Sequence, residues 1–589
     1  MDNNNAKKAL KTHLHTAMIK MKKKIYSLGI ITLLATITIS ASANTYYLSS
    51  KGNDSNTGKS IKTAWSTIRY LNTKDLAAGD TVLLEGGTVF NGFISLNDKD
   101  GNNPTKPLVF SSYGKGKAIV HNTNRNQCGF FGYNTQGIEV RNLIFESLSN
   151  DSTHVKNDGI AFYNDLDGGI RLKNIVIKNC EVRNFGHNGI AIGGYPPTVC
   201  NTGFDKVVID SVWVHDVREN GILTYGKEKQ DQIGWANHNI RITNSVIHDV
   251  TGYSTRGHKG SGIIIAQVDS CLIDHCVAYN NGTLNTACGG PGGIWAWSTN
   301  NVTIQYCESH HNSSGKEKGC DGLGFDFDGG VTNSTLQYCY SHDNDGAGIL
   351  LGQYDVARPW AHNTVRYNIS ENDARTNNSP LTIFKGSGCS FNGLQIYNNT
   401  VYVSPSEKNH TKTLSAFQIT EWVTGVHGIN IFNNIFETTG GIPLMNVPKG
   451  YYGRFNGNLY WTNGSPEAIF YQGINYSTVE SWRLATGNET INGQSTAIVA
   501  DPQLTNKGAG KIMYPLHPEK LDGYKLTSSS PAKNAGVDLK AEFGVEVGQR
   551  DFFGNPSLTD GKFDIGAAEL APTVVPEVKT SPEPKRKKK

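Results

Sequence analysis

The sequence predicts an all-β protein built as a solenoid, in which about ten coils of short parallel strands stack on one another. Three observations predict it. Glycine is abundant, with 65 of 589 residues, and no heptad or long amphipathic helical pattern occurs. Short strands of the form Gly-apolar-x-apolar recur, as in DGIAF at Asp158, NGIAI at Asn188 and SGIII at Ser261. A second alternating strand follows each of them.

The second strands align on one column of small or amide residues, with steps of 29 to 35 residues. This column contains Cys180, Val212, Ser245, Cys276, Cys307, Cys339, Asn368, Asn399 and Asn434. Stacked parallel strands fit these short units better than a helical array, and a β-propeller would need four antiparallel strands per unit. The column cysteines are therefore predicted to be buried thiols, about 4.8 Å apart per coil, whereas the state of Cys200 and Cys288 in loops stays open.

The N-terminus predicts export. Lys20 to Lys24 include four lysines, residues 25–40 are largely apolar, and Ala41-Ser42-Ala43 fits a signal-peptidase site. We expect a secreted or periplasmic protein, cleaved after Ala43, with no stable membrane insertion afterwards. A transmembrane anchor is the alternative, but the apolar stretch is short for one.

Five segments are expected along the chain, and we expect it to act as a monomer. They are an N-terminal extension with the signal peptide (1–43), an opening and capping segment (44–100), the solenoid (101–460), an irregular C-terminal region (461–571) and a disordered basic tail (572–589). The formal charge of +4 arises at the ends, because residues 1–24 carry a net +6 and residues 572–589 a net +4, leaving −6 for the rest. This charge excludes a general basic surface for nucleic acid.

Two stretches near the ends of the predicted solenoid indicate a family. They are YYLSSKGNDSNTGKSIKTAWSTI (residues 46–68) and FDIGAAEL (residues 563–570). With the repeat between them, the chain resembles the right-handed parallel β-helix proteins of the pectate-lyase-like superfamily, over roughly residues 45–570. The resemblance implies an exported polysaccharide-degrading protein. It does not identify the reaction, because lyases, hydrolases, epimerases and adhesins share this scaffold.

Aromatic residues occupy outward positions of the first strands. Strand alternation directs Tyr163, Tyr225, Trp295 and Trp297 away from the core. Sugar rings stack on such exposed rings, so we predict that these four residues bind substrate. The alternative is that loops cover them. By contrast, a column of histidines at the ends of the second strands is predicted to be a structural turn ladder.

The stretch DGLGFDFDGG, residues 321–330, carries the strongest chemical signal. Asp326 and Asp328 lie two residues apart on one strand, so both should leave the same face, and like charges there need a cation or a proton. Asp321 and Asp345 could complete a Ca²⁺ site with them. The alternative is that Asp321 and Asp345 are turn residues.

The resemblance implies β-elimination, in which a Lys or Arg base removes the C5 proton of a uronate while a cation neutralises its carboxylate. Lys385, expected two coils beyond Asp326 in a similar register, is one candidate base. Arg358, His258 and Lys259 complete the candidate basic set. We therefore expect a polysaccharide lyase that cleaves a uronate-containing polysaccharide.

Two other functions stay open. A glycoside hydrolase could use the Asp326–Asp328 pair, since inverting hydrolases need carboxyl groups roughly 6.5 to 9.5 Å apart. The sequence GHKG at Gly257 only approximates the Gly-His-Gly of polygalacturonases, which argues against a close relationship with them. A non-catalytic carbohydrate-binding or adhesion protein would explain the aromatic residues but not the clustered charges.

Overall fold

The computed structural model describes residues 43–570, apart from residues 125, 149–156, 199–200, 229–232, 253–257, 288, 316–319, 387–390, 409–413, 421–425, 513–517 and 559–560. The chain divides into two units, residues 1–44 and 45–589, and the second contains all the elements discussed below. The predicted signal peptide and basic tail lie outside the described residues, as do Cys200 and Cys288. Among the described residues, no helix combines the length and the apolar character that spanning a bilayer requires.

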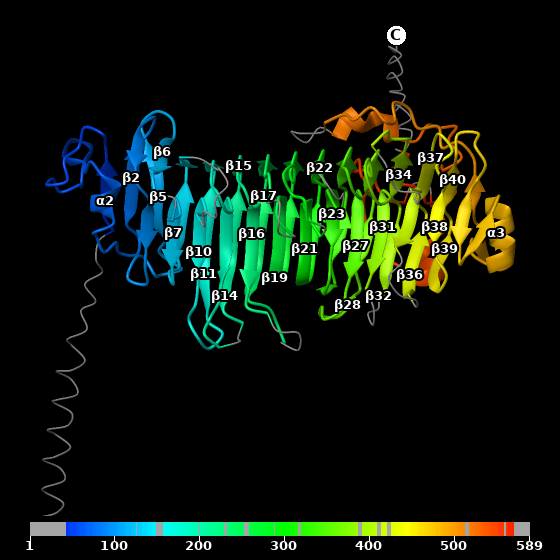
Figure 1. Cartoon of the computed structure of the whole chain (residues 1–589), viewed down its shortest axis with the longest axis horizontal. Helices are drawn as coiled ribbons and strands as arrows, with labels where there is room; N and C mark the ends of the chain where they lie inside the picture. The colour runs from blue at the N-terminus through cyan, green and yellow to red at the C-terminus, as the bar shows by residue number, and fades with distance from the viewer. Residues whose placement is uncertain are drawn as a thin grey trace, which may run out of the picture. The chain divides into compact units, whose positions relative to one another are not determined.

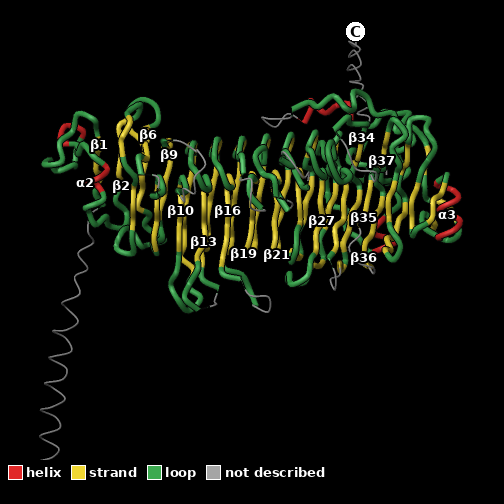
Figure 2. The backbone as a smooth tube through the Cα atoms, in the orientation of Figure 1, coloured by secondary structure: helices red, strands yellow, loops and turns green. Residues whose placement is uncertain are grey.

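The fold is a parallel β-solenoid of about ten coils, as predicted (Figure 1). Its larger sheet has 29 strands and its second sheet has 14, with helices only as short additions (Figure 2). The larger sheet contains β1 (Thr45–Leu48), β2 (Thr81–Glu85), β4 (Ile94–Leu96), β5 (Leu108–Tyr113), β7 (Phe130–Tyr133), β8 (Ile138–Arg141), β10 (Ile160–Tyr163), β11 (Arg171–Lys178), β13 (Ile190–Gly194), β14 (Gly203–Asp210), β16 (Asn220–Gly226), β17 (Asn237–Thr243), β19 (Ser261–Asp274), β21 (Gly292–Gln305), β23 (Leu323–Phe327), β24 (Val331–Thr332), β25 (Thr335–Gln337), β27 (Ile349–Gln353), β28 (Trp360–Ala361), β29 (Thr364–Arg366), β31 (Leu381–Lys385), β32 (Phe391–Asn392), β33 (Leu394–Tyr397), β35 (Phe417–Thr420), β36 (Val426–Phe432), β38 (Met445–Val447), β39 (Tyr451–Asn456), β41 (Ile469–Tyr471) and β42 (Ile474–Tyr476).

The second sheet contains β3 (Val89–Asn91), β6 (Ala118–Asn122), β9 (Leu143–Ser147), β12 (Glu181–Arg183), β15 (Trp213–His215), β18 (Val246–His248), β20 (Val277–Tyr279), β22 (Glu308–His310), β26 (Tyr340–His342), β30 (Ile369–Glu371), β34 (Thr400–Val403), β37 (Ile435–Thr438), β40 (Leu459–Trp461) and β45 (Ile498–Val499). The remaining elements are η1 (Ile61–Thr63), α2 (Ile68–Leu71), α3 (Val479–Thr486), β43 (Thr490–Ile491), β44 (Gln494–Ser495), η2 (Pro518–Tyr524) and α4 (Leu539–Phe543).

The larger sheet forms two faces of each coil. In most coils these faces are separate strands, but β19 and β21 run for 14 residues through both. Each of these long strands contains two residues with positive φ. The first of the two, Gln267 (φ 56°) in β19 and Ser298 (φ 49°) in β21, are joined by a 2.9 Å hydrogen bond between their side chains. A left-handed residue inside a strand redirects the chain, so each long strand bends from one face to the next.

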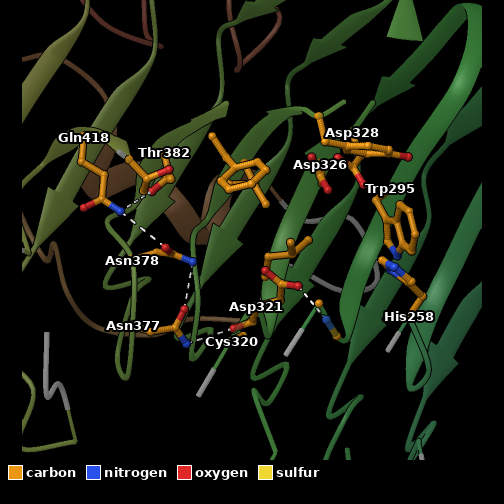
Figure 3. A pocket seen from close by; sticks show the side chains of 17 residues that line it. His258, Trp295, Cys320, Asp321, Asp326, Asp328, Asn377, Asn378, Thr382 and Gln418 are labelled. Carbon is orange, nitrogen blue, oxygen red and sulfur yellow. Dashed lines mark hydrogen bonds between the residues drawn. The ribbon is translucent and has the colours of Figure 1, made fainter. Parts of the chain in front are cut away.

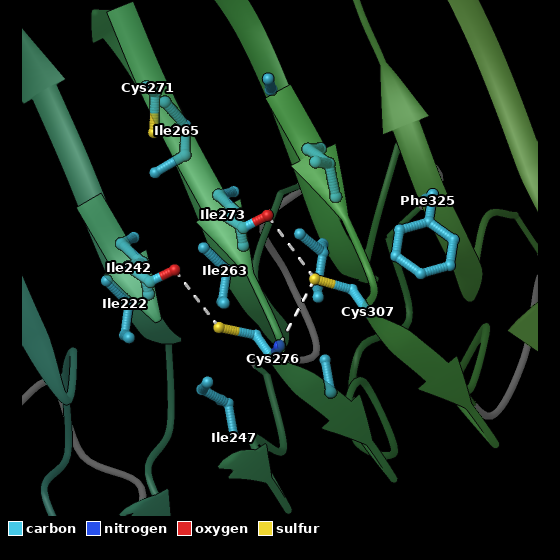
Figure 4. Packing of buried hydrophobic residues seen from close by; sticks show 14 of the residues in the cluster. Ile222, Ile242, Ile247, Ile263, Ile265, Cys271, Ile273, Cys276, Cys307 and Phe325 are labelled. Atoms are coloured by element: carbon cyan, nitrogen blue, oxygen red, sulfur yellow. Dashed lines mark hydrogen bonds between the residues drawn. The ribbon is translucent and has the colours of Figure 1, made fainter. Parts of the chain in front are cut away.

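The predicted column of small and amide residues forms a buried ladder inside the solenoid. Cys180, Cys276, Cys307 and Cys339 are buried free thiols, which confirms their predicted role. In Figure 4 the Sγ of Cys276 lies 3.5 Å from the carbonyl oxygen of Ile242. A thiol so placed satisfies a backbone group while filling apolar space.

Asparagine replaces cysteine in the later coils of this ladder and adds a side-chain hydrogen bond to every step. Asn368 Nδ2 donates to Asn399 Oδ1 (3.0 Å), Asn399 to Asn434 (2.9 Å) and Asn434 to Asn458 (3.0 Å). Glu489 ends the series by accepting from Asn458 at 2.7 Å. All these groups are buried, so each bond gives a partner to a polar group whose burial without one would cost free energy.

The C-terminal region returns along the later coils (Figure 1, orange to red). Its apolar residues, among them Leu521, Tyr524 and Leu539, pack with Tyr340 and Ile369 in a cluster separate from the main core. This segment therefore covers part of the second sheet.

Replacement of Asn399 by alanine should lower the free energy of unfolding by roughly 1–3 kcal/mol. The reason is that the buried side-chain amide and the backbone N–H of Asn368 would both lose their acceptor, Asn399 Oδ1. Thermal or urea unfolding followed by circular dichroism measures the loss. Asn91→Ala, at an exposed strand position, is the control and should change stability by no more than about 0.5 kcal/mol. Equal effects of the two substitutions would contradict a stabilising ladder.

Candidate functional site

A cavity of about 790 Å³ lies over the larger sheet and extends from β21 to β35 (Figure 3). One line of side chains across its floor consists of cross-strand neighbours: Trp295, Asp326, Leu350, Thr382 and Gln418. Asp328, Phe384 and Thr420 form a second line of lining side chains, each two residues later in the chain than a member of the first line. Strand register alone therefore brings the acidic and amide groups together.

Three carboxyl groups converge in this cavity, from Asp321, Asp326 and Asp328 (Figure 3). Asp326 is only 5% exposed, and its Oδ1 has no hydrogen-bond partner among the described residues. Burial, with the nearby charges of Asp328 and Asp321, raises the pKa of Asp326 well above its ordinary value. Burial also raises the pKa of Asp328 to about 7.

Asp321 is directed into the cavity by its loop. The residue has a left-handed backbone (φ 58°) between Cys320, which is disulfide-bonded, and Gly322 (φ 77°). Its Oδ2 accepts from the Gly290 N–H at 2.7 Å, and Asn377 Nδ2 donates to its carbonyl oxygen at 3.1 Å. Burial raises the pKa of Asp321, whereas the Gly290 N–H and His258 oppose this shift by favouring the charged carboxylate.

His258 and Trp295 form the wall at the N-terminal side of the cavity (Figure 3). Their rings lie 6.1 Å apart, and the Trp295 indole N–H donates to Ser261 Oγ at 3.1 Å. Trp295 is only 5% exposed, so little of the predicted sugar platform is open to solvent. Burial lowers the pKa of His258, which favours a neutral imidazole.

Amide side chains form the opposite wall. Asn378 Nδ2 donates to Asn377 Oδ1 at 2.8 Å, and Gln418 Nε2 lies 3.5 Å from Asn378 Oδ1 and 3.3 Å from Thr382 Oγ1 (Figure 3). These groups hold one another in place and retain further donors and acceptors. The wall suits hydroxyl-rich ligands.

Three of the predicted basic residues do not line the cavity. Lys385 pairs with Gln353 in register and faces away from Phe384, its cavity-lining neighbour, so it lies buried on the other side of the strand. Arg358 donates to the Gly234 carbonyl at 2.7 Å and lies over the Trp235 ring. Lys259 forms an ion pair with Glu219.

Four other predicted residues also lie outside the cavity lining. The Tyr163 ring stacks on Tyr133 at 6.3 Å, and Tyr225 stacks on Tyr195 at 5.9 Å, several coils before the acids. Trp297 is half-buried beside the cavity. The Asp345 carboxylate accepts hydrogen bonds from Ser313, Ser314 and Thr376, as a turn residue does.

Calcium binding by Asp321, Asp326, Asp328 and Asp345 stays a prediction. Within the described part of the chain, the groups of three or more potential ligands whose atoms lie within 4.8 Å of one another all contain histidine. None of them combines three of these four aspartates.

Asn377, Asn378, Thr382, Gln418, Tyr354 and Phe384 line the cavity but were not predicted from the sequence. For Thr382 and Gln418 a signal exists, because they occupy the outward position of TIF and QIT, in the same column as Trp295 and Asp326. Asn377, Asn378 and Tyr354 come from loops outside the repeat, and no spacing rule locates them.

Comparisons with known proteins find relatives of low sequence identity. No protein-family model matches it. It is 24% identical over 637 aligned residues to a lacto-N-biosidase of Bifidobacterium longum, and the match covers 91% of this chain but only 37% of that protein. A GH136 lacto-N-biosidase structure from Eubacterium ramulus has a TM-score of 0.47 at 17% identity, covering 73% of this chain and 65% of the other. The pectate lyase Pel9A has a TM-score of 0.38 at 14% identity, covering 90% of this chain and 96% of the other. Structural likenesses of this size say nothing about the reaction.

Proposed function

We propose that the chain is a carbohydrate-active enzyme that hydrolyses a glycosidic bond with the carboxyl groups of the cavity. The supporting observation is the convergence of Asp321, Asp326 and Asp328, with unequal proton affinities, in a cavity whose lining, as far as the described residues show it, includes no lysine or arginine. Glycoside hydrolysis needs one protonated and one charged carboxyl group at the bond to be broken.

Asp328 is our choice for the proton donor. It is half-buried and lines the cavity, and a pKa of about 7 keeps much of it protonated near neutral pH. Asp321 is the partner carboxylate, because its Oδ2 accepts a hydrogen bond from the Gly290 N–H, which favours the charged form against the effect of burial. Asp326, buried and lacking a partner for Oδ1, stays neutral and can donate a hydrogen bond to the sugar.

The uronate lyase expected from the sequence has less support. β-Elimination needs a base at C5 and a cation on the substrate carboxylate, and Lys385, Arg358 and Lys259 all lie outside the cavity lining. The charged Asp321 carboxylate would also repel a uronate. A hydrolase is the alternative that the sequence leaves open, and the name of the Bifidobacterium relative, a biosidase, favours it.

We propose an uncharged saccharide as the substrate. Asn377, Asn378 and Gln418 offer amide donors and acceptors to hydroxyl groups, while Trp295 and Phe384 offer apolar surface to sugar rings. This chain covers only 37% of the lacto-N-biosidase, so that protein's own substrate is not carried over. Export after Ala43 and action as a monomer remain predictions.

Incubation of the purified chain with neutral oligosaccharides and with uronate polymers tests the reaction type. We expect new reducing ends from a neutral substrate, with no ultraviolet absorbance from an unsaturated uronate, and no effect of a calcium chelator. Absorbance that rises with the reducing ends would establish a lyase. Saccharide binding without either signal would support the adhesion alternative.

Replacement of Asp328 by asparagine should lower kcat/KM at least 10²-fold, because an amide cannot protonate the leaving group. In the unmodified enzyme kcat/KM should fall above about pH 7, as the Asp328 carboxyl loses its proton. Asp205→Asn, outside the cavity on another face, is the matched control and should keep full activity. A pH profile that is flat to pH 9 would contradict Asp328 as the acid.

Replacement of Asp326 by asparagine should stabilise the protein at pH 8 but not near pH 4. The folded-state pKa of Asp326 is raised, so the wild type loses stability as pH rises from about 4, where the unfolded carboxyl ionises, through the folded-state value. Asparagine removes this titration. Scanning calorimetry at the two pH values measures the difference, and an equal stability change at both would argue against a buried, neutral Asp326.

A further inference from the structure

Two neighbouring coils place several potential metal ligands at the C-terminal ends of two adjacent strands in the middle of the second sheet, outside the cavity lining. β22 ends at His310 and is followed by His311, while β26 ends at His342 and is followed by Asp343. His310 and His342 are cross-strand partners, so the two dipeptides lie side by side. One ligand atom each from His311, His342 and Asp343 lie within 4.8 Å of one another.

Ring orientation selects this group over a second one in the same place. Glu308, His310 and His342 also have ligand atoms within 4.8 Å, but the His310 and His342 rings are stacked at 4.6 Å and 16°. The lone pair of an imidazole nitrogen lies in the ring plane, so stacked rings cannot aim at one ion. The His311 ring stands at 89° to that of His342, and His311 is exposed, which gives an ion access.

Outer contacts hold the ligands in place. His342 Nε2 lies 3.3 Å from Glu308 Oε1, and both side chains are fully buried, so this nitrogen is directed at Glu308 and away from Asp343. That leaves Nδ1, 3.0 Å from Asp343 Oδ2, as the metal-binding atom. The Nδ1 atoms of His310 and His311 are 2.8 Å apart, which orients the His311 ring. A second contact of this kind on a ligating histidine is typical of metal centres.

Other coils show what His311 adds. His215 and Asp216, and likewise His248 and Asp249, occupy the same columns with His Nδ1 to Asp Oδ2 distances of 2.7 and 2.6 Å. Within the described residues neither pair belongs to a group of three close ligands. A contact between histidine and aspartate alone is therefore a feature of the turn. Among these coils, the third potential ligand is present where His311 occupies the position that Asp216 and Asp249 hold in other turns.

We propose that His311, His342 and Asp343 bind a divalent transition-metal ion of the Zn²⁺ class, with water completing its coordination. Two imidazoles and one carboxylate suit Zn²⁺, whereas Ca²⁺ takes six to eight oxygen ligands. The ion would join two coils just before Ser313 and Ser314, whose hydrogen bonds to Asp345 begin the loop that leads to Asp321. The site is separate from the proposed hydrolase chemistry.

Zinc binding by the chelator-treated, purified chain tests the proposal. Isothermal titration and metal analysis after dialysis should find one tightly bound Zn²⁺ per chain, with no comparable binding of Ca²⁺. His311→Asn keeps a residue that tolerates the left-handed backbone there (φ 53°) and should weaken binding at least tenfold, as should Asp343→Asn.

Asp249→Asn, in the matching turn of an earlier coil, is the control and should bind Zn²⁺ as the wild type does. Circular dichroism of the metal-free variants checks that each one folds. Absence of Zn²⁺ binding by the wild type, or equal binding by the wild type, His311→Asn and Asp343→Asn, would overturn the proposal. The test does not use enzyme activity, so it is independent of the proposed reaction.

Discussion

Parallel hydrogen bonding between successive coils is the constraint on which the rest of this structure depends. Each strand of a coil pairs in register with its equivalent one coil later, as Ile160 does with Ile190 and Ile190 with Ile222. Register fixes which residues are neighbours, and alternation fixes which of them face inward. Every column, buried or exposed, follows from these two rules. The cavity is therefore a surface feature of a regular scaffold, to which loops add individual residues.

The columns of equivalent residues in successive coils explain which parts of the structure can be predicted from the sequence. The repeat, the inward thiols and the amide ladder follow from spacing and period, and the structure confirms them. Among the site predictions, Asp321, Asp326, Asp328, His258 and Trp295 do line the cavity. Lys385 shows where the reasoning fails, because a shift of one residue in a strand reverses the direction of a side chain. Asn377 and Tyr354 come from loops of irregular length, which no period describes.

The cavity places carboxyl groups where the scaffold disfavours their charged form. Asp326 lies in a strand whose neighbours in the column are Trp295 and Leu350, and the described residues of the lining include no lysine or arginine to compensate a charge there. Local stability is reduced so that a carboxyl group can hold a proton near neutral pH, which is common at catalytic sites. The amide ladder inside the same coils works in the opposite sense, because its polar groups are paired throughout. The rigid interior thus supports an unfavourable arrangement on the surface.

The amide ladder also has a direction. Each asparagine donates its Nδ2 hydrogen to the next coil and accepts from the previous one, until Glu489, whose carboxyl oxygens accept and pass nothing on. The ladder is thus an open-ended series with a dedicated terminator. Duplicating a whole coil between Asn368 and Asn434 would leave every donor with an acceptor, so coil number can change in evolution without disturbing the core. Truncation before Glu489 would instead leave a buried donor unpaired at the new end.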